Sequence, residues 1–309
     1  MATTRLRQIA LTAVAALIAL SGLSACATRP VNQQIKVLGS DTMEKLTADW
    51  VRMYMRGHQG EQILVRAGDT GAGIASLIAG DIDLAAASRE MTEEERALAK
   101  SKGVRLKRVT VARDAVAIIV SPVNKLTRIS LEDLRKVYLG QINTWQKLDP
   151  SQNAADPIRA FGREASSGTS DYFQKHILQG DAYGGDVKLM PSSEAIIGGV
   201  MGNRLAIGFV GMAQAHQAHD KVKILKLNMS STAANAAATT TVSAASNAET
   251  SDEALSSDEY PLSRPLLFYY DLSKEAKVKA FVDYCLSKDG QAAVSEMGFM
   301  PAHKTNASK

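Results

Sequence analysis

The amino-acid sequence predicts an α/β protein with mostly parallel sheets. Short apolar or alternating runs at residues 35–38, 63–65 and 116–120 have the length and period of β-strands. Patterns with helical periodicity lie between them, and this alternation is typical of α/β layers. The 309-residue chain is long enough for two lobes of ordinary domain size, each with its own core.

Residues 1–25 have the features of an export signal. Arg5 and Arg7 precede an apolar run at 9–20 that is too short to span a bilayer comfortably. The run is followed by Leu-Ser-Ala-Cys, which ends at Cys26 and resembles the bacterial lipobox, in which the cysteine is acylated. We therefore expect a lipid anchor on this cysteine that holds the mature chain to a membrane on the periplasmic or cell-surface side. The alternative is an ordinary secreted protein without an anchor.

The rest of the sequence indicates a lobe boundary, an insertion and then further regular structure. Pro122 breaks the chain after the third strand and a capped amphipathic helix follows at 130–138, so we expect a lobe boundary near 112–122. At 228–258 the composition shifts to Ala, Ser, Thr and Asn with almost no large apolar side chains, which is typical of a disordered surface insertion. After it, the pattern predicts a strand that ends near residue 270 and helices at about 274–287 and 290–297.

The composition excludes some classes of function. Loss of Arg5 and Arg7 with the signal lowers the formal net charge from +4 to +2, which is nearly neutral. Lys and Arg are scattered among acidic residues and aromatic residues make up only 5% of the chain, so nucleic-acid binding is not expected. Acylation of Cys26 would leave Cys285 without a disulfide partner, and the helical pattern around Cys285 favours a buried, inert thiol.

Four polar turns follow predicted strands. Two of them, at 39–43 and 166–170, run directly into helices, where hydroxyls, unpaired N–H groups and the positive end of the helix dipole converge. The third, at 68–73, also opens a helix, and its glycines allow close backbone approach to a ligand. The fourth, at 87–89, follows the strand-like run 83–86. A single turn of this kind is usually a plain helix cap, but α/β sheets gather such turns at the carboxyl ends of their strands, where ligands bind.

Arg163 adds a cation to this set of turns. It lies just before the helix start at 166–170 and follows a strand-like run at 158–161. Its fixed fork of donors suits a tetrahedral anion. Because a guanidinium is combined with hydroxyl-rich helix starts, the sequence predicts an oxyanion-binding site.

The sequence resembles the phosphate-binding proteins of bacterial phosphate-specific ABC transporters over nearly the whole mature chain. The matching stretches occur in the order found in the family, and the ordered set is specific although each stretch alone is not. They are Gly39-Ser40-Asp41-Thr42, Gly68-Asp69-Thr70-Gly71-Ala72-Gly73-Ile74, Asp83 to Arg89, Arg163-Glu164 with Ser167-Gly168-Thr169, Tyr260-Pro261-Leu262-Ser263-Arg264-Pro265, and Gly290-Gln291 with Gly298-Phe299.

The resemblance implies a two-lobed periplasmic-binding-protein (Venus-flytrap) fold that closes around inorganic phosphate and delivers it to an ABC transporter permease in the inner membrane. One lobe would comprise residues 33–113 and 268–309, and the other residues 114–267. It implies a monomer that needs no cofactor or metal. By motif position, the phosphate ligands would be Ser40, Thr42, Thr70, Gly71 and Ser88 from the first lobe, and Arg163, Ser167, Gly168 and Thr169 from the second.

A proton acceptor is also expected in the site, because a buried P–OH group without a partner costs about 1–3 kcal/mol. Some family members place a carboxylate directly after the serine that matches Ser88, whereas Arg89 stands there in this chain, as in another branch of the family. We expect Asp41 to be the acceptor, with Asp69 as the second choice, although Asp41 is equally suited to capping a helix. Arg89 could form a structural ion pair with Glu90 or Asp69.

The sequence leaves room for few other classes of function. An enzyme is not expected, because the sequence has no Gly-x-Ser-x-Gly elbow, no His-Glu-x-x-His and no phosphate loop that ends in Gly-Lys-Ser/Thr. His216 and His219 have metal-ligand spacing, but nothing adjacent completes a ligand set, so two exposed histidines are expected. The nearer alternative is a binding protein for another oxyanion, such as sulfate or molybdate. A third alternative is a surface lipoprotein for adhesion or phosphate sensing with the same fold.

Overall fold

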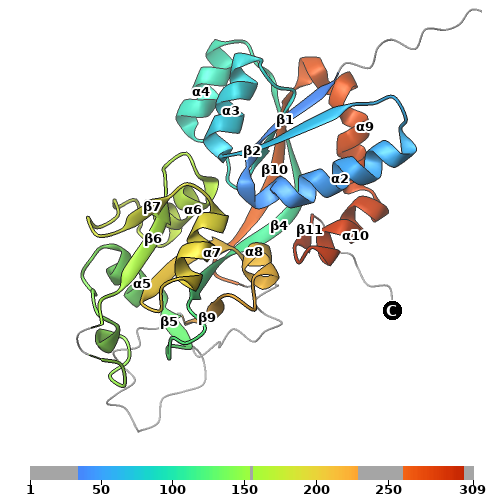
Figure 1. Cartoon of the computed structure of the whole chain (residues 1–309). Helices are drawn as coiled ribbons and strands as arrows, with labels where there is room; N and C mark the ends of the chain where they lie inside the picture. Colours follow the sequence, from blue (N-terminus) through green and yellow to red (C-terminus); the bar gives the residue numbers. More distant parts are fainter. Residues whose placement is uncertain (1–33, 154–155, 229–259, 303–309) are drawn as a thin grey trace, which may run out of the picture. The chain divides into compact units, whose positions relative to one another are not determined.

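Strands and helices alternate along the chain in the computed structural model (Figure 1), which describes residues 34–153, 156–228 and 260–302. The α/β class predicted from the sequence is thereby confirmed. The expected signal segment, the expected lipid anchor and nearly all of the expected insertion lie outside the described residues.

The described elements follow one another in this order along the chain. The strands are β1 (Ile35–Ser40), β2 (Ile63–Gly68), β3 (Leu84–Ala87), β4 (Leu106–Val120), β5 (Arg128–Ser130), β6 (Arg159–Arg163), β7 (Lys188–Met190), β8 (Ala206–Gly211), β9 (Lys223–Asn228), β10 (Ser263–Asp271) and β11 (Met300–Pro301). The helices are α2 (Glu44–Gly57), α3 (Thr70–Ala79), α4 (Glu93–Ser101), α5 (Leu131–Tyr138), α6 (Gly168–His176), α7 (Ser193–Met201), α8 (Met212–Gln217), α9 (Glu275–Leu286) and α10 (Lys288–Glu296), with short 3₁₀ turns η1 (Asp41–Met43), η2 (Trp145–Lys147) and η5 (Leu272–Lys274).

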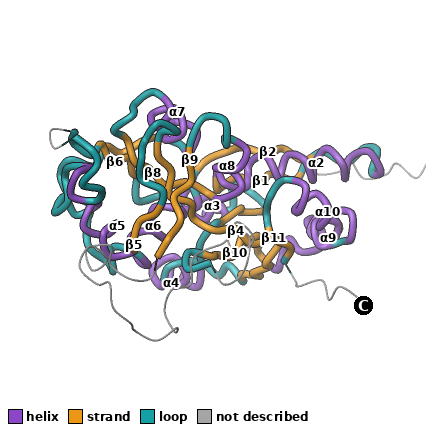
Figure 2. Tube along the Cα trace, turned by 90° about the horizontal axis from the view of Figure 1, so that it is seen from below, coloured by secondary structure: helices purple, strands orange, loops and turns teal. Residues whose placement is uncertain are grey.

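The sheet formed by the described strands is mixed. Its main path runs β2-β1-β3-β10-β4-β8-β6-β7, and Figure 2 shows these strands among the helices. The predicted parallel pairing holds at both ends of the path. At one end β1 pairs with both β2 and β3, and at the other end β6 pairs with both β7 and β8. In the middle, β10 and β4 are antiparallel to each other, and each is antiparallel to its other neighbour on the path.

Local sequence signals determine where helices begin. The predicted capped helix is α5, in which the Ser130 side chain accepts a hydrogen bond from the Asp133 N–H. Thr92 and Glu95 form a capping box at the start of α4. The last helix begins at Lys288 rather than at the expected Gly290, because the Ser287 side chain accepts from the N–H of Gly290 and caps the helix two residues earlier. None of the described helices is both long and apolar enough to span a bilayer.

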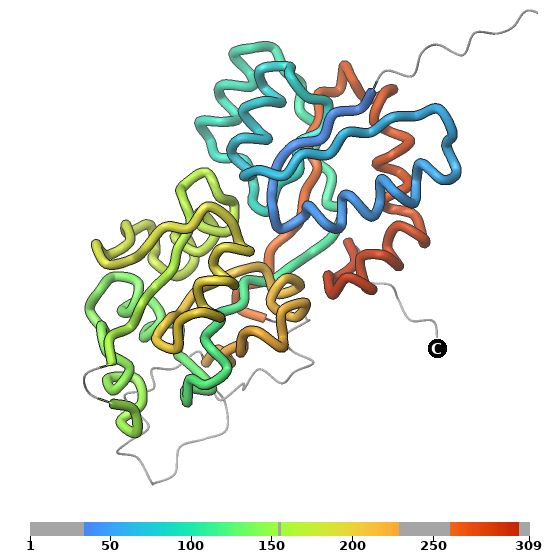
Figure 3. The backbone as a smooth tube through the Cα atoms, in the orientation of Figure 1, coloured from blue at the N-terminus to red at the C-terminus, as the bar shows by residue number. Residues whose placement is uncertain are grey.

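Apolar side chains gather in separate cores along this sheet. One core contains Trp145, Phe173 and Phe209 together with the second half of β4. A second core contains Trp50, Phe281 and residues from the first half of β4 and from β10, and a smaller third cluster packs α3 against β3. The antiparallel strands β4 and β10, which run side by side in Figure 3, therefore supply side chains to more than one core.

Candidate functional site

The first polar turn lies at the end of β1 and leads through η1 into α2. Ser40, Asp41 and Thr42 are all buried. Gly39 has a φ of +149°, and a Cβ atom there would stand 2.0 Å from the carbonyl oxygen of Ala86. Only glycine permits this close approach of β1 to β3, which places the first turn beside the turn that follows β3.

Thr70 and Ser88 lie beside the first polar turn and contact each other. Thr70 is the first residue of α3, and its hydroxyl accepts a hydrogen bond from the Ser88 N–H at 3.1 Å, while the two hydroxyl oxygens lie 3.4 Å apart. Gly73 lets α3 pack directly against β1, because a Cβ atom there would stand 2.6 Å from the Leu38 carbonyl oxygen. Ser88 itself does not open a helix, because α4 begins only at Glu93, after its own cap.

The start of α6 faces these two hydroxyls. Ser167 is its N-cap, and the Ser167 side chain accepts from the Ser170 N–H at 3.3 Å. A Cβ atom on Gly168 would stand 2.4 Å from Thr70 Oγ1 and 2.5 Å from Ser88 Oγ. The structure therefore brings together residues that the sequence predicted for opposite sides of the ligand. The next residue, Thr169, is also buried, and its hydroxyl oxygen lies 3.3 Å from that of Thr42.

Arg163, at the end of β6, connects the same two groups of residues. It is 2% exposed and donates to Asp41 Oδ2 and to Asp69 Oδ1, both at 2.6 Å. Ser193 supports this arrangement, since both its N–H (3.0 Å) and its hydroxyl (2.9 Å) donate to Asp41 Oδ2. A buried guanidinium between two carboxylates is charge-compensated, which a buried cation requires. The arginine is thus a bridge as well as a donor.

Two functional residues were missed by sequence reasoning. Ser193 is the first residue of α7, which Ser192 caps as Ser167 caps α6, so the helix-start signal was present in the sequence. Arg264 lies within a stretch that matches the family, but the sequence alone indicates no role for it. It is fully buried and donates to Thr169 Oγ1 at 2.9 Å, Thr42 Oγ1 at 3.2 Å and Asp114 Oδ2 at 3.1 Å.

Two neighbouring residues, Arg89 and Gly71, have protein partners in the structure. Arg89 forms a structural ion pair, but its partner is Glu95, at 2.7 and 2.8 Å, and not Asp69 or Glu90. Its hydrogen bond to Glu90 goes to the backbone carbonyl oxygen of that residue. The Gly71 N–H, expected to donate to the ligand, donates instead to the Ser166 carbonyl oxygen at 3.0 Å. Because a protein acceptor already holds this N–H, Gly71 is left out of the ligand set proposed below.

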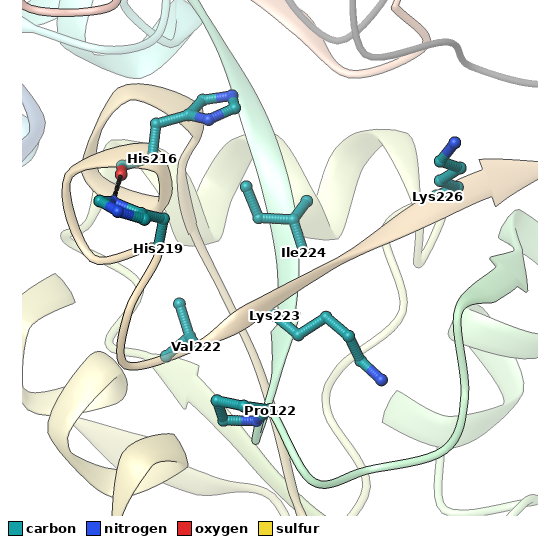
Figure 4. Close-up of a pocket in the computed structure, with 7 residues that line it drawn as sticks. All are labelled: Pro122, His216, His219, Val222, Lys223, Ile224 and Lys226. Carbon is teal, nitrogen blue, oxygen red and sulfur yellow. Dashed lines mark hydrogen bonds between the residues drawn. The ribbon is translucent and has the colours of Figure 1, made fainter.

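A surface pocket of about 410 Å³ lies away from these residues, between α8 and β9 (Figure 4). His216 and His219 are both exposed there, as expected, and the Nδ1 atom of His219 donates to the His216 carbonyl oxygen at 3.0 Å. No cluster of three or more His, Cys, Asp or Glu residues suited to a metal occurs in the part of the chain that the structure describes. The pocket is lined by Pro122, His216, His219, Val222, Lys223, Ile224 and Lys226.

Cys285 lies in α9 and is fully buried, as predicted from its helical pattern. Burial raises the pKa of its thiol well above the ordinary value. The thiol is therefore protonated and shielded at neutral pH, which makes it an inert part of the core.

The chain is similar in sequence to known proteins. A family model described as a PBP superfamily domain matches residues 24–289. The chain is 30% identical over 274 residues to the phosphate-binding protein PstS of Staphylococcus aureus, an alignment that covers 85% of this chain and 77% of that protein.

The fold is also similar to those of solved structures. A phosphate ABC transporter substrate-binding protein from Clostridium perfringens, solved with bound phosphate, matches with a TM-score of 0.72 and 25% identity over 87% of this chain and 99% of that one. An ABC-type phosphate transport receptor from Vibrio cholerae shares the fold, with a TM-score of 0.64 and 23% identity over 86% of this chain and 99% of that one.

Proposed function

Since the chain belongs to the periplasmic-binding-protein (PBP) superfamily and, within it, to the phosphate-binding proteins of phosphate-specific ABC transporters, we propose that it binds inorganic phosphate outside the cytoplasm and delivers it to an ABC importer. Members of this family are solute-binding proteins, so the chain is a binding protein and not an enzyme. The observation that carries the proposal is the convergence of the Thr70 and Ser88 hydroxyls on Gly168 at the start of α6.

The hydroxyls around this point are set up to donate. A hydroxyl group has one proton and two acceptor lone pairs. The Thr70 hydroxyl accepts from the Ser88 N–H and the Ser167 hydroxyl accepts from the Ser170 N–H. Each of these oxygens therefore has a protein donor and keeps its proton for another acceptor, and the oxygens of phosphate supply such acceptors.

Backbone and guanidinium donors complete the set. Gly168 and Thr169 are the first two residues of α6, where N–H groups have no acceptor within the helix and the positive end of the dipole lies. Such a helix start binds anions. Arg163 Nε is buried and makes no hydrogen bond to the described residues, so one donor of this guanidinium stays open for the ligand. The proposed ligands are Ser40, Thr42, Thr70, Ser88, Arg163, Ser167, Gly168 and Thr169.

Asp41 is the proposed acceptor for the phosphate proton. All three hydrogen bonds that the described residues donate to this carboxylate fall on Oδ2, which leaves Oδ1 to accept another proton. Asp69 is less suitable, because Arg163 donates to its Oδ1 and the Ser166 hydroxyl donates to its Oδ2 at 2.7 Å. A carboxylate acceptor favours hydrogen phosphate over sulfate, which has no proton to donate at neutral pH.

The proposal includes the organisation of the mature protein. We propose two lobes that close on the ligand and take the separate cores as their interiors. One lobe comprises residues 33–113 and 268–309, and the other comprises residues 114–267. Contacts made from both sides stabilise the closed form. We also propose a signal peptide at 1–25, a lipid anchor on Cys26, a monomeric state and a permease partner.

Calorimetric titration of the purified, phosphate-free chain from residue 27 onward tests the proposal. Tight one-to-one binding of phosphate without a response to sulfate supports it, and the double variant Thr70→Val/Ser88→Ala should then bind phosphate at least about tenfold more weakly. Ser101→Ala is the matched control, because Ser101 is exposed and its hydroxyl donates to the Leu98 carbonyl oxygen of its own helix turn. Tighter binding of sulfate or molybdate would assign the site to another oxyanion, and no response to any of them would overturn the proposal.

A further inference from the structure

Arg264 and Asp114 form a buried pair where β10 and β4 pass between cores. The two residues stand opposite each other in the antiparallel register, and Arg264 Nη2 donates to Asp114 Oδ2 at 3.1 Å. Their side chains are 0% and 1% exposed. Tyr260 and Leu262, just before β10, and residues just after Asp114 in β4 contribute to the core with Trp145, and residues on the other side of the pair contribute to the core with Trp50.

The guanidinium reaches one hydroxyl from each side of the candidate site. Its Nη1 donates to Thr169 Oγ1 at 2.9 Å, and its Nη2 donates to Thr42 Oγ1 at 3.2 Å. A guanidinium has only donors, so both threonine oxygens must accept from it. The direction of each hydroxyl proton is thereby constrained to point away from Arg264.

The hydroxyl groups of Thr42 and Thr169 have two protons, but a hydrogen bond between them uses only one. Their oxygens lie 3.3 Å apart, so one hydroxyl can donate to the other. The remaining proton needs an acceptor outside the pair. We infer that Arg264, held by Asp114, is a positioning residue that directs this proton to the bound oxyanion and so sets which protonation state of phosphate the site prefers.

The surroundings of Asp114 are shaped for this pair. The Asp114 carboxylate neutralises the buried guanidinium and also accepts from the Ala213 N–H at 3.4 Å. Gly211 leaves the necessary room, since a Cβ atom there would stand 2.7 Å from Asp114 Oδ2 and 3.1 Å from Thr42 Cγ2. The same glycine position thus accommodates both the carboxylate and the threonine that the pair orients.

The inference deepens the proposed function and rests on it. At the threonines the site would offer only donors, and at Asp41 it would offer an acceptor. Hydrogen phosphate matches both, because it has one protonated and three unprotonated oxygens. Dihydrogen phosphate has a second proton, which would meet a donor at the threonines or elsewhere in the site. Affinity should therefore fall as phosphate takes up its second proton, and Arg264 should account for part of that dependence.

The test compares phosphate titrations of the wild type and the double variant Arg264→Gln/Asp114→Asn at two pH values on either side of the second ionisation of phosphate. The double change leaves no unpaired buried charge, which would itself destabilise the chain. Arg204→Gln/Asp156→Asn is the matched control, since Arg204 and Asp156 form the same kind of pair with an exposed arginine. Melting curves confirm that each variant is folded; if the neutral pair does not fold, Arg264→Lys, which lacks the planar fork, takes its place.

We expect the variant to bind phosphate about tenfold more weakly at the higher pH, the loss expected for one misdirected hydrogen bond, and to lose less at the lower pH. A merely structural role would weaken binding equally at both pH values, and that result would overturn the inference, as would an unchanged affinity. A wild type that binds no phosphate would overturn the proposed function and the inference with it, whereas a wild type that binds normally beside an unaffected variant would overturn the inference alone.

Discussion

The hydroxyl oxygen of Thr70 lies 2.4 Å from the point at which a Cβ atom on Gly168 would stand. The Ser88 hydroxyl oxygen lies 2.5 Å from the same point. Real Cβ atoms do not approach oxygen atoms so closely, so these hydroxyls can meet the start of α6 only because residue 168 is glycine. The contact joins segments from both proposed lobes, and its loss should affect closure before it affects folding.

Gly168→Ala should therefore weaken phosphate binding by at least about tenfold while the chain stays folded, because the added methyl group holds the two hydroxyls away from the helix start. Calorimetry measures the affinity, and small-angle scattering with and without phosphate measures closure. Gly198→Ala is the control, since a Cβ atom on this helical glycine would have no neighbour within 4 Å among the described residues. Normal phosphate affinity in Gly168→Ala would show that the ligand does not lie at this point.

Arg163→Ala should lower phosphate affinity by about 100-fold, roughly 2.7 kcal/mol, which is in the range for hydrogen bonds to a charged group. The change also leaves Asp41 and Asp69 without the cation that they share, so closure should become less favourable. Titration and scattering check the two effects separately. Arg204→Ala removes an exposed arginine from an ion pair and should change neither. Wild-type affinity in Arg163→Ala would mean that the site has been assigned to the wrong part of the chain.

Asp41→Asn tests the proton acceptor. The amide still accepts through one oxygen but now offers donors where the P–OH group would lie, so phosphate affinity should fall by about tenfold or more and sulfate binding should strengthen. The measured quantity is the ratio of the two affinities. Asp283→Asn is the matched control, because it makes the same change to a carboxylate that pairs with Lys279 on the surface. Unchanged phosphate affinity with unchanged rejection of sulfate would eliminate Asp41 as the acceptor.

Much of the site could be predicted because its parts are local signals. A serine or threonine at a helix start is visible in the sequence, and the carboxyl ends of neighbouring strands bring such starts together. Thr70 is an example of such a start, and Ser88 and Gly168, which the family resemblance adds to the expected set, lie beside it. Their role toward phosphate remains a prediction that the experiments above address.

The residues that were missed depend on long-range register. Arg264 contacts Asp114 because β10 and β4 pair antiparallel, and no spacing in the sequence reports that pairing. The partner of Arg89 was mistaken for a related reason. Glu95 folds back to accept from the Thr92 N–H in the capping box, and this conformation brings its carboxylate to Arg89, whereas sequence proximity pointed to Glu90.

Asp83 should contribute to stability in a pH-dependent way. Its side chain is buried and accepts from Lys277 at 2.7 Å and from the Lys36 N–H at 2.9 Å, with Lys274 at 3.2 Å. Burial alone would raise the pKa of this carboxyl, but the hydrogen bonds from Lys277, from the Lys36 N–H and from Lys274 hold the pKa below its ordinary value. A depressed pKa in the folded state means that the stabilisation is fully present above the unfolded value of about 3.9 and is lost as the pH falls through the folded value.

Asp83→Asn should accordingly lower the free energy of unfolding by about 2–3 kcal/mol at neutral pH, and the difference from the wild type should shrink in acid, where the wild-type carboxyl is also neutral. Urea unfolding at a series of pH values measures this difference. Asp283→Asn is the control, because Asp283 pairs with Lys279 on the surface, where such pairs contribute at most about 1 kcal/mol. A difference between Asp83→Asn and the wild type that persists undiminished in acid would show that the loss comes from packing rather than from the charge of Asp83.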